Sequence, residues 1–169
     1  MTASANPEHP LVSVCFVCLG NICRSPTAEG VFTKLVIDAG LRNQIAIDSA
    51  GTGAWHKGEQ ADKRARAEAS KRGMVLHSVA RQVTRIDFDR FDLLIAMDRT
   101  NLGDLEAIAP TATARAKIRL FRSFDPLSPN EGEIPDPYYG GNDGFERVFD
   151  MCTAAGRGLL AYVRSTYGV

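Results

Sequence analysis

The sequence lacks an excess of charge of either sign, a membrane-length hydrophobic run and the residue pattern expected of a secretory leader. Its 20 Lys and Arg residues balance 20 Asp and Glu residues, so no overall field favours nucleic acid or a membrane surface as a partner. The apolar stretches are strand-length, far below the roughly 20 residues of a transmembrane helix. The N-terminal MTASANPEHPLVSVCFV has no basic segment before a long apolar run, so no signal peptide is predicted. Any bound anion must therefore be held by local geometry.

Cysteine is scarce and unevenly distributed. Three of the four cysteines lie within residues 15–23, and none lies between 24 and 151. This pattern is unlike a secreted disulfide framework and favours the reduced cytoplasm, although it leaves secretion without a signal peptide open. A zinc site from Cys15, Cys18, Cys23 and Cys152 would need three ligands from one short turn, so no metal or other cofactor is expected. Cys15 is predicted to face the core, which disfavours a Cys15–Cys18 redox pair.

Strand-like and helix-like segments alternate along the chain. Strands are predicted at 11–17, 44–51, 91–98 and 116–124, and helices at 25–40, 60–73, from 100 to before Pro110, and over 145–168. This alternation predicts right-handed βαβ units and an α/β three-layer sandwich around a parallel sheet. With 169 residues the chain is expected to form one domain, residues 1–169, in which 1–10 are a flexible N-terminal extension.

The segment CLGNICR joins the first strand to the first helix, at the carboxyl end where ligands of parallel sheets bind. A helix start directs backbone N–H groups and a positive dipole end at an anion. Gly20 and Asn21 tolerate left-handed backbone angles, as a tight anion nest requires. Arg24 adds a planar set of donors that matches two phosphate oxygens. The segment is not a Walker loop. It predicts a phosphate site.

Cys18 is the predicted nucleophile at the mouth of this site. The positive helix end favours its thiolate, which can attack phosphorus and form a phosphocysteine. Ser25 is placed to hydrogen-bond the sulfur and help it leave. The leaving group needs a proton donor, and Asp136 in the long loop 125–144 is the candidate. Taken alone, Asp136 could also be a turn residue before Pro137.

The segments VCLGNICRSPTAEGVF and DPYYG resemble the N-terminal signature and the acid loop of the low-molecular-weight protein tyrosine phosphatases. DSAGTGAWHKG (48–58) and ARQV (80–83) also match, and the SAGTG-x-WH form is most similar to bacterial, particularly actinobacterial, members. The resemblance covers nearly the whole chain. It implies a phosphotyrosine protein phosphatase I-like, flavodoxin-like fold with a four-stranded parallel sheet. It also implies a metal-independent hydrolase of protein phosphotyrosine and small aryl phosphates.

The resemblance assigns Cys18 as nucleophile, Arg24 as phosphate clamp, and Asp136 as acid in the first step and base in the second. Residues of the loop and of the cleft walls are implied to bind substrate: Leu19, Gly20, Asn21, Ile22, Cys23, Ser25, Trp55, Tyr138 and Tyr139. The expected partners are tyrosine-phosphorylated proteins, with phosphate or other oxyanions as product or inhibitors. A tyrosine kinase acting on Tyr138 or Tyr139 is left open, as is a protective disulfide between Cys23 and Cys18.

One position departs from the family pattern. Members often have a histidine three residues before the arginine of the ARQ segment, where it braces the loop asparagine. Here Ser78 occupies that position, beside His77. Asn21 is therefore expected to be supported by Ser49 and Ser78.

Several alternative interpretations remain. A thiol-dependent arsenate reductase of the same fold shares the loop but needs further cysteines downstream, which the region from 24 to 151 lacks. A non-catalytic phosphotyrosine-binding module needs neither the thiol nor the acid, and a structural flavodoxin-like domain leaves the long loop unexplained. Trp55 could instead be a core residue. Asp98 could pair with a cation or cap a helix.

Overall fold

The fold is built on a four-stranded parallel sheet. The computed structural model describes residues 9–128, 132–141 and 143–169, so most of the expected extension 1–10 lies outside the described residues. The strands are β1 (Val12–Cys18), β2 (Ile45–Gly51), β3 (Leu93–Ala96) and β4 (Ile118–Leu120), in the order β2-β1-β3-β4. Because β1 pairs with β2 on one side and β3 on the other, its carboxyl end lies where ligands bind to such sheets.

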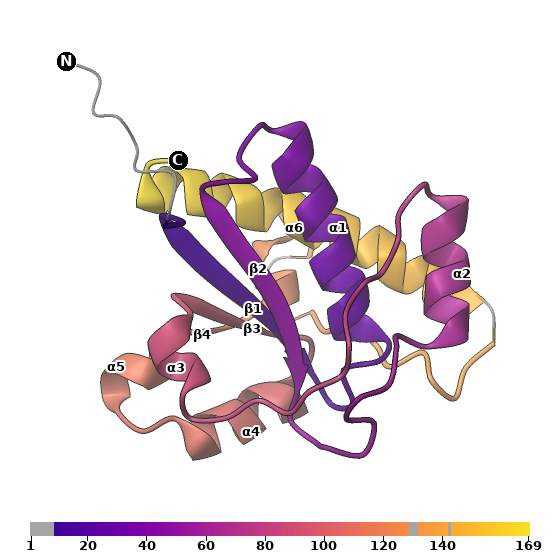
Figure 1. The fold of residues 1–169 in the computed structure, drawn as a ribbon, viewed down its shortest axis with the longest axis horizontal. Coiled ribbons are helices and arrows are strands. Elements are labelled where there is room, and N and C mark those ends of the chain that lie inside the picture. Colours follow the sequence, from indigo (N-terminus) through magenta and orange to yellow (C-terminus); the bar gives the residue numbers. More distant parts are fainter. Residues whose placement is uncertain (1–8, 129–131, 142) are drawn as a thin grey trace.

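Helices cover both faces of the sheet (Figure 1). α1 (Arg24–Asp38) and α6 (Asp143–Tyr167) pack on one face, and α2 (Lys63–Lys71) lies beside α6. α3 (Asp87–Arg90), α4 (Arg99–Ile108) and α5 (Ala112–Arg115) lie on the other face. The α/β three-layer sandwich and its four parallel strands are thereby confirmed.

The alternation of side chains along β1 separates two cores. Phe16 packs on the α1 and α6 side, with its ring 5.5 Å from Phe32 and 5.1 Å from Phe121 between centroids. Cys15 points to the opposite side and is fully buried, as predicted. Burial raises the pKa of Cys15, and burial likewise raises the pKa of Cys152 in α6. Both thiols therefore remain protonated core groups.

The strand predicted over 116–124 is wrong beyond Leu120, because residues Phe121–Phe124 form a 3₁₀ helix. The cause is tertiary packing against α6. A Cβ atom at Gly158 would lie 1.7 Å from the carbonyl oxygen of Phe124, so the backbone of this turn fits directly against the helix only because Gly158 has no side chain. Sequence reasoning also missed α3 and α5, which have four residues each, too few to show a helical period.

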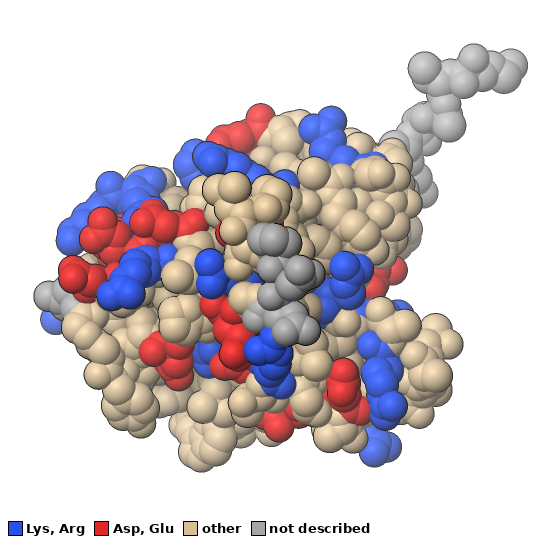
Figure 2. Space-filling view, turned by 180° about the vertical axis from the view of Figure 1, so that it is seen from behind, with Lys and Arg blue, Asp and Glu red and all other residues tan. Residues whose placement is uncertain are grey.

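The charged side chains of the face in Figure 2 are interspersed. Lys and Arg alternate there with Asp and Glu over the described residues, in keeping with the balanced composition. Within the described part of the chain, no helix has the length and hydropathy needed to span a membrane.

Candidate active site

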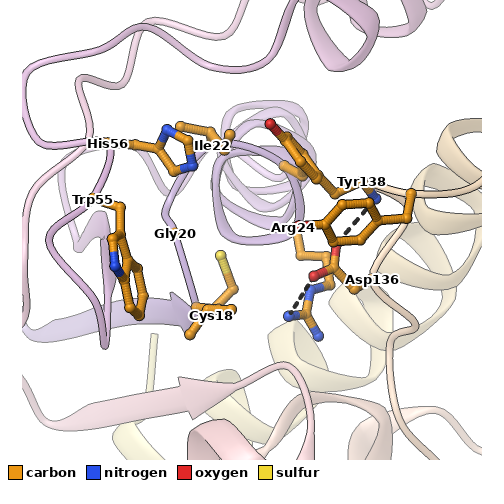
Figure 3. Close-up of a pocket in the computed structure, with 11 residues that line it drawn as sticks. Cys18, Gly20, Ile22, Arg24, Trp55, His56, Asp136 and Tyr138 are labelled. Carbon is orange, nitrogen blue, oxygen red and sulfur yellow. Dashed lines mark hydrogen bonds and ion pairs between the residues drawn. The ribbon is translucent and has the colours of Figure 1, made fainter.

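Cys18, Arg24 and Asp136 meet at one cavity (Figure 3). Cys18 is the last residue of β1 and Arg24 the first of α1, and both are almost fully buried. Asp136 comes from the loop before α6, and its Oδ2 lies 3.7 Å from Nη2 of Arg24. The cavity measures about 340 Å³. Its lining comprises Cys18, Leu19, Gly20, Ile22, Cys23, Arg24, Trp55, His56, Asp136, Tyr138 and Tyr139.

Aromatic side chains form the walls of the cavity. Trp55 stands on one side and Tyr138 on the other, with Cys18 between them (Figure 3). Trp55 is 73% exposed, so the alternative that it is a core residue is wrong. Its indole lies over Gly53, where a Cβ atom would be 1.7 Å from the ring. Tyr138 and Tyr139 make an edge-to-face pair with centroids 4.9 Å apart. These rings give the cavity aromatic walls.

The sulfur of Cys18 is surrounded by hydrogen-bonding groups. The backbone N–H of Asn21 donates to Sγ over 3.3 Å, and the hydroxyl of Ser25 lies 3.0 Å away. The Ser25 hydroxyl is also 3.4 Å from the carbonyl oxygen of Ala50, so its proton can turn toward either atom. Donors beside the sulfur, at the N-terminus of α1, stabilise a thiolate.

The backbone of the loop has a left-handed residue at Asn21, with φ of 56°. Gly20, which was expected to share this conformation, has no positive φ. A Cβ atom there would lie 3.0 Å from the His56 ring, so a larger residue would require a small shift of that side chain. His56 lines the cavity and contacts Oε2 of Glu59 through Nδ1 at 2.8 Å. Sequence reasoning had assigned it no place in the cavity.

The side chain of Asn21 braces the loop from behind. Its Nδ2 donates to Ser25 Oγ at 2.8 Å and to Ser49 Oγ at 3.0 Å, and its Oδ1 accepts from the backbone N–H of Arg81 at 3.1 Å. The structure therefore brings Ser49 to Asn21. No hydrogen bond joins Ser78 to Asn21, so the expectation of direct support from Ser78 is wrong; its hydroxyl instead lies close enough to Glu29 to act against the rise in the pKa of that carboxyl.

Two residues expected to bind substrate lie behind the loop. The side chains of Asn21 and Ser25 are 1% and 0% exposed and do not line the cavity. Their contacts are with the sulfur and with the bracing network described above. The other residues expected to bind substrate all line the cavity.

Asp98 makes both of the contacts that the sequence left open. Its Oδ2 forms an ion pair with Nη1 of Arg24, and its Oδ1 accepts from the backbone N–H of Asn101 at 2.8 Å as the N-cap of α4. Nη1 of Arg24 also donates to the carbonyl oxygen of Ile134 at 3.1 Å. Although burial acts the other way, the charges of Cys18, Asp98 and Asp136 raise the pKa of Arg24. The guanidinium is thus permanently charged and fixed.

Cys23 lines the same cavity as Cys18 and is 5% exposed. Burial and the nearby charge of Asp62 raise the pKa of its thiol. All four cysteines are free thiols. A disulfide between Cys23 and Cys18 stays a prediction. Across residues 9–128, 132–141 and 143–169, no three His, Cys, Asp or Glu side chains gather in the manner of metal ligands.

Glu29 extends the bracing network and was not anticipated from the sequence. Its Oε2 accepts from Ser49 Oγ at 3.2 Å. Burial, reinforced by the charge of Asp48, raises the pKa of Glu29 to about 7, against the opposing effects of Ser49 and Arg81. Below pH 7 the carboxyl is therefore largely protonated in the folded protein, whereas in the unfolded chain it ionises near its ordinary value of about 4.3.

We expect the free energy of unfolding to fall as the pH rises from 5 to 8, because Glu29 is already ionised in the unfolded chain over this range, whereas the native state loses the Glu29 proton only near pH 7. Glu29→Gln removes this titrating group, so between pH 5 and pH 8 the free energy of unfolding of the variant should fall by about 1–3 kcal/mol less than that of wild type. Urea unfolding at pH 5 and pH 8 measures the difference. Glu146→Gln, an exposed site, is the control. The same pH dependence of the free energy of unfolding in Glu29→Gln and wild type would contradict the raised pKa of Glu29.

Comparison with known proteins gives one family, although the similar structures also include a Drosophila arginine phosphatase, with a TM-score of 0.81 at 30% identity, covering 89% of this chain and 97% of that chain. A sequence profile of the family described as low molecular weight phosphotyrosine protein phosphatase matches residues 13–167. The chain is 52% identical over 152 residues to a low molecular weight protein-tyrosine-phosphatase of Streptomyces coelicolor, covering 89% of this chain and 93% of that protein. It is 42% identical to the human low molecular weight phosphotyrosine protein phosphatase, covering 90% and 96%. A protein tyrosine phosphatase structure from Entamoeba histolytica has a TM-score of 0.87 at 39% identity, covering 92% and 98%.

Proposed function

The chain belongs to the low molecular weight phosphotyrosine protein phosphatase family, and we propose that it hydrolyses protein phosphotyrosine and small aryl phosphates through a phosphocysteine on Cys18. The observation that carries this proposal is the convergence of Cys18, Arg24 and Asp136 on one aromatic-walled cavity. An arsenate reductase is not favoured, because no cysteine lies between 24 and 151. A binding module would use neither the thiol nor the carboxyl group.

In the first step, the Cys18 thiolate attacks phosphorus and forms an S–P bond while the bond from phosphorus to the aryl oxygen breaks. Asp136 donates its proton to that oxygen, so the product leaves as a neutral phenol. The guanidinium of Arg24 and the loop N–H groups stabilise the negative charge on the equatorial oxygens of the phosphoryl group. The fixed position of Arg24, paired with Asp98 and Ile134, supports this role.

In the second step, the Asp136 carboxylate accepts a proton from water as the water oxygen attacks phosphorus. The S–P bond breaks, inorganic phosphate is released, and the electron pair returns to Cys18 as a thiolate. The Ser25 hydroxyl, 3.0 Å from the sulfur, stabilises that leaving thiolate by donating a hydrogen bond. The side chain of Asp136 is 40% exposed, which supports the access of water that this step needs.

The walls of the cavity favour an aromatic phosphate ester. Cys18 lies at the base, and the rings of Trp55 and Tyr138 rise on either side of it. We expect a tyrosine ring to pack between these walls, whereas phosphoserine has no ring to make those contacts. Tyrosine-phosphorylated proteins of the cytoplasm are the proposed substrates, and inorganic phosphate is expected to inhibit as the product. Tyr139, at 93% exposure, is accessible to a tyrosine kinase.

The function is tested by comparing a phosphotyrosine peptide with the same peptide carrying phosphoserine. We expect kcat/KM for the phosphotyrosine peptide to be higher by at least about 10²-fold, because the lost ring contacts amount to several kcal/mol. Trp55→Ala should narrow this ratio by raising KM for the phosphotyrosine peptide. Equal hydrolysis of both peptides, or hydrolysis of neither, would refute the proposed function.

Replacing Asp136 by asparagine removes the proton donor but keeps the size of the side chain and an oxygen that can accept from the backbone N–H of Tyr138. We expect kcat/KM for phenyl phosphate to fall by about 10²–10⁴-fold. The decrease should be smaller for p-nitrophenyl phosphate, whose leaving group needs less protonation. Steady-state kinetics with both esters measure this difference. Unchanged hydrolysis of phenyl phosphate would assign the acid to another residue.

A further inference from the structure

The N-terminus of α2 lies next to the loop that carries the nucleophile. Asp62 is the N-cap of α2, and its Oδ1 accepts from the backbone N–H of Arg64 at 2.8 Å. The backbone N–H of Asp62 donates to the carbonyl oxygen of Ile22 at 2.7 Å, and Ile22 lines the cavity. The start of α2 is therefore fixed to the phosphate loop.

The side chain of Arg64 reaches from this point to the loop that carries Asp136. Its Nε and Nη2 donate to Oδ1 and Oδ2 of Asp62, each at 3.1 Å, and its Nη1 donates to the carbonyl oxygen of Tyr138 at 3.1 Å. Although burial acts in the opposite direction, the hydrogen bonds from Arg64 hold the pKa of Asp62 below its usual value. Asp62 and Arg64 thus form a bidentate ion pair, which a lysine at position 64 could not reproduce.

Two aromatic rings pack against the guanidinium of Arg64. Its Cζ lies 4.6 Å from the ring centroid of Phe145 and 5.4 Å from that of Tyr138. Phe145 is 3% exposed and belongs to the first turn of α6, which follows directly on the loop of Asp136. In Figure 1, α2 lies beside this part of α6. Packing and hydrogen bonding therefore orient Arg64 together.

Tyr138 connects Arg64 to Asp136 through its own backbone N–H and carbonyl groups. The backbone N–H of Tyr138 donates to Oδ1 of Asp136 at 3.0 Å, while the carbonyl oxygen of the same residue accepts from Arg64. A displacement of Tyr138 would therefore move the carboxyl group of Asp136. Arg64 itself does not line the cavity.

We propose that Arg64 is a positioning residue that holds Asp136 in place to protonate the leaving group, by joining Asp62 to the carbonyl oxygen of Tyr138. This inference rests on the proposed function, in which Asp136 is the general acid. Because Arg64 acts through the acid loop, its loss should weaken proton transfer and leave phosphate binding intact. A displacement of about 1 Å at a reacting group can reduce the rate about 10²-fold.

The experiment measures kcat/KM of Arg64→Ala with phenyl phosphate and p-nitrophenyl phosphate, together with inhibition by inorganic phosphate. We expect a decrease of about 10- to 100-fold with phenyl phosphate and less than about 3-fold with p-nitrophenyl phosphate, with phosphate inhibition unchanged. In an Asp136→Asn background, Arg64→Ala should have no further effect on phenyl phosphate hydrolysis. Arg64→Lys keeps the positive charge but not the bidentate ion pair, so its kcat/KM for phenyl phosphate should lie between those of wild type and Arg64→Ala.

Arg72→Ala is the matched control. Arg72 also joins α2 to α6, through Asp150 at 2.9 Å and a contact of 5.2 Å with the Phe149 ring, but it does not touch the acid loop. Arg72→Ala should change kcat/KM for the two esters by the same factor or leave both values unchanged. Equal losses with both esters in Arg64→Ala, wild-type activity, or losses that add to those of Asp136→Asn would overturn the role of Arg64. If Asp136→Asn itself shows no dependence on the leaving group, the assignment of Asp136 as general acid fails instead, whereas failure of the peptide comparison refutes the proposed function.

Discussion

Cys18→Ser is expected to lower kcat/KM for aryl phosphates by on the order of 10⁵-fold, with the fold and phosphate binding preserved. The serine hydroxyl is a far weaker nucleophile than a thiolate, and nothing in the loop is arranged to deprotonate it. The groups around Cys18 suit a thiolate, because the N–H of Asn21 donates to the sulfur at 3.3 Å and the Ser25 hydroxyl, 3.0 Å away, can donate to it as well. Serine fits that space, since it is the smaller residue.

The measurement combines steady-state kinetics with a thermal melt and a calorimetric titration with inorganic phosphate. Cys15→Ala is the matched control, because Cys15 is also a buried thiol of β1 but points to the opposite side of the sheet. It should reduce stability and leave kcat/KM within a few-fold of wild type. Activity of Cys18→Ser within 10-fold of wild type would mean that the phosphoryl group is not transferred to Cys18.

Local patterns predicted the fold because each major element has its own signal. β1 is a short run of β-branched and apolar residues, and α1 begins at the end of the loop and stops before Gly40, which has a φ of 72°. β4 was overestimated because its end depends on α6, which packs against the backbone of Phe124 through Gly158. Such a contact between distant segments has no local signature in the sequence.

The candidate site was predictable where its residues lie in short motifs. Cys18, Arg24 and Asp136 are in segments whose spacing already indicates phosphate chemistry. The supporting side chains are different: Glu29 reaches the loop through Ser49, and Arg64 reaches Tyr138 across 74 positions. Charged residues on helices usually face solvent, so these two positions read as ordinary surface until the helices are placed against the loops.

The double contact of Asp98 illustrates the same limit. The sequence placed it at the ligand edge of the sheet, where a helix cap and an ion pair were equally reasonable. The structure uses one carboxylate oxygen for each: Oδ1 caps α4 and Oδ2 pairs with Arg24. The cap is a local property of the chain, whereas the ion pair spans 74 positions and depends on the order of the strands.

Arg24→Lys is expected to lower kcat/KM by about 10³-fold and to weaken inhibition by inorganic phosphate. Nη1 of Arg24 is occupied by Asp98 and by the carbonyl oxygen of Ile134, while Nη2 points toward Asp136, 3.7 Å away. The guanidinium therefore has donors for the protein and for the phosphate at the same time. A lysine ammonium is a compact charge whose three N–H donors are not coplanar, so it cannot present two parallel donors to the phosphate while it pairs with Asp98.

Asp98→Asn distinguishes the contribution of the Asp98–Arg24 ion pair from that of the N–H groups that Arg24 offers to the phosphate. It keeps the acceptor for the N–H of Asn101 and the shape of the cap, but removes the negative charge beside Arg24. If the phosphate clamp is the guanidinium itself, Asp98→Asn should lower kcat/KM by only about 10-fold, well below the effect of Arg24→Lys. Equal losses in the two variants would mean that the ion pair, and not the donors of Arg24, sets the rate. Near wild-type kinetics of Arg24→Lys would exclude Arg24 as the clamp, because an ammonium cannot replace two parallel N–H donors to one phosphoryl group.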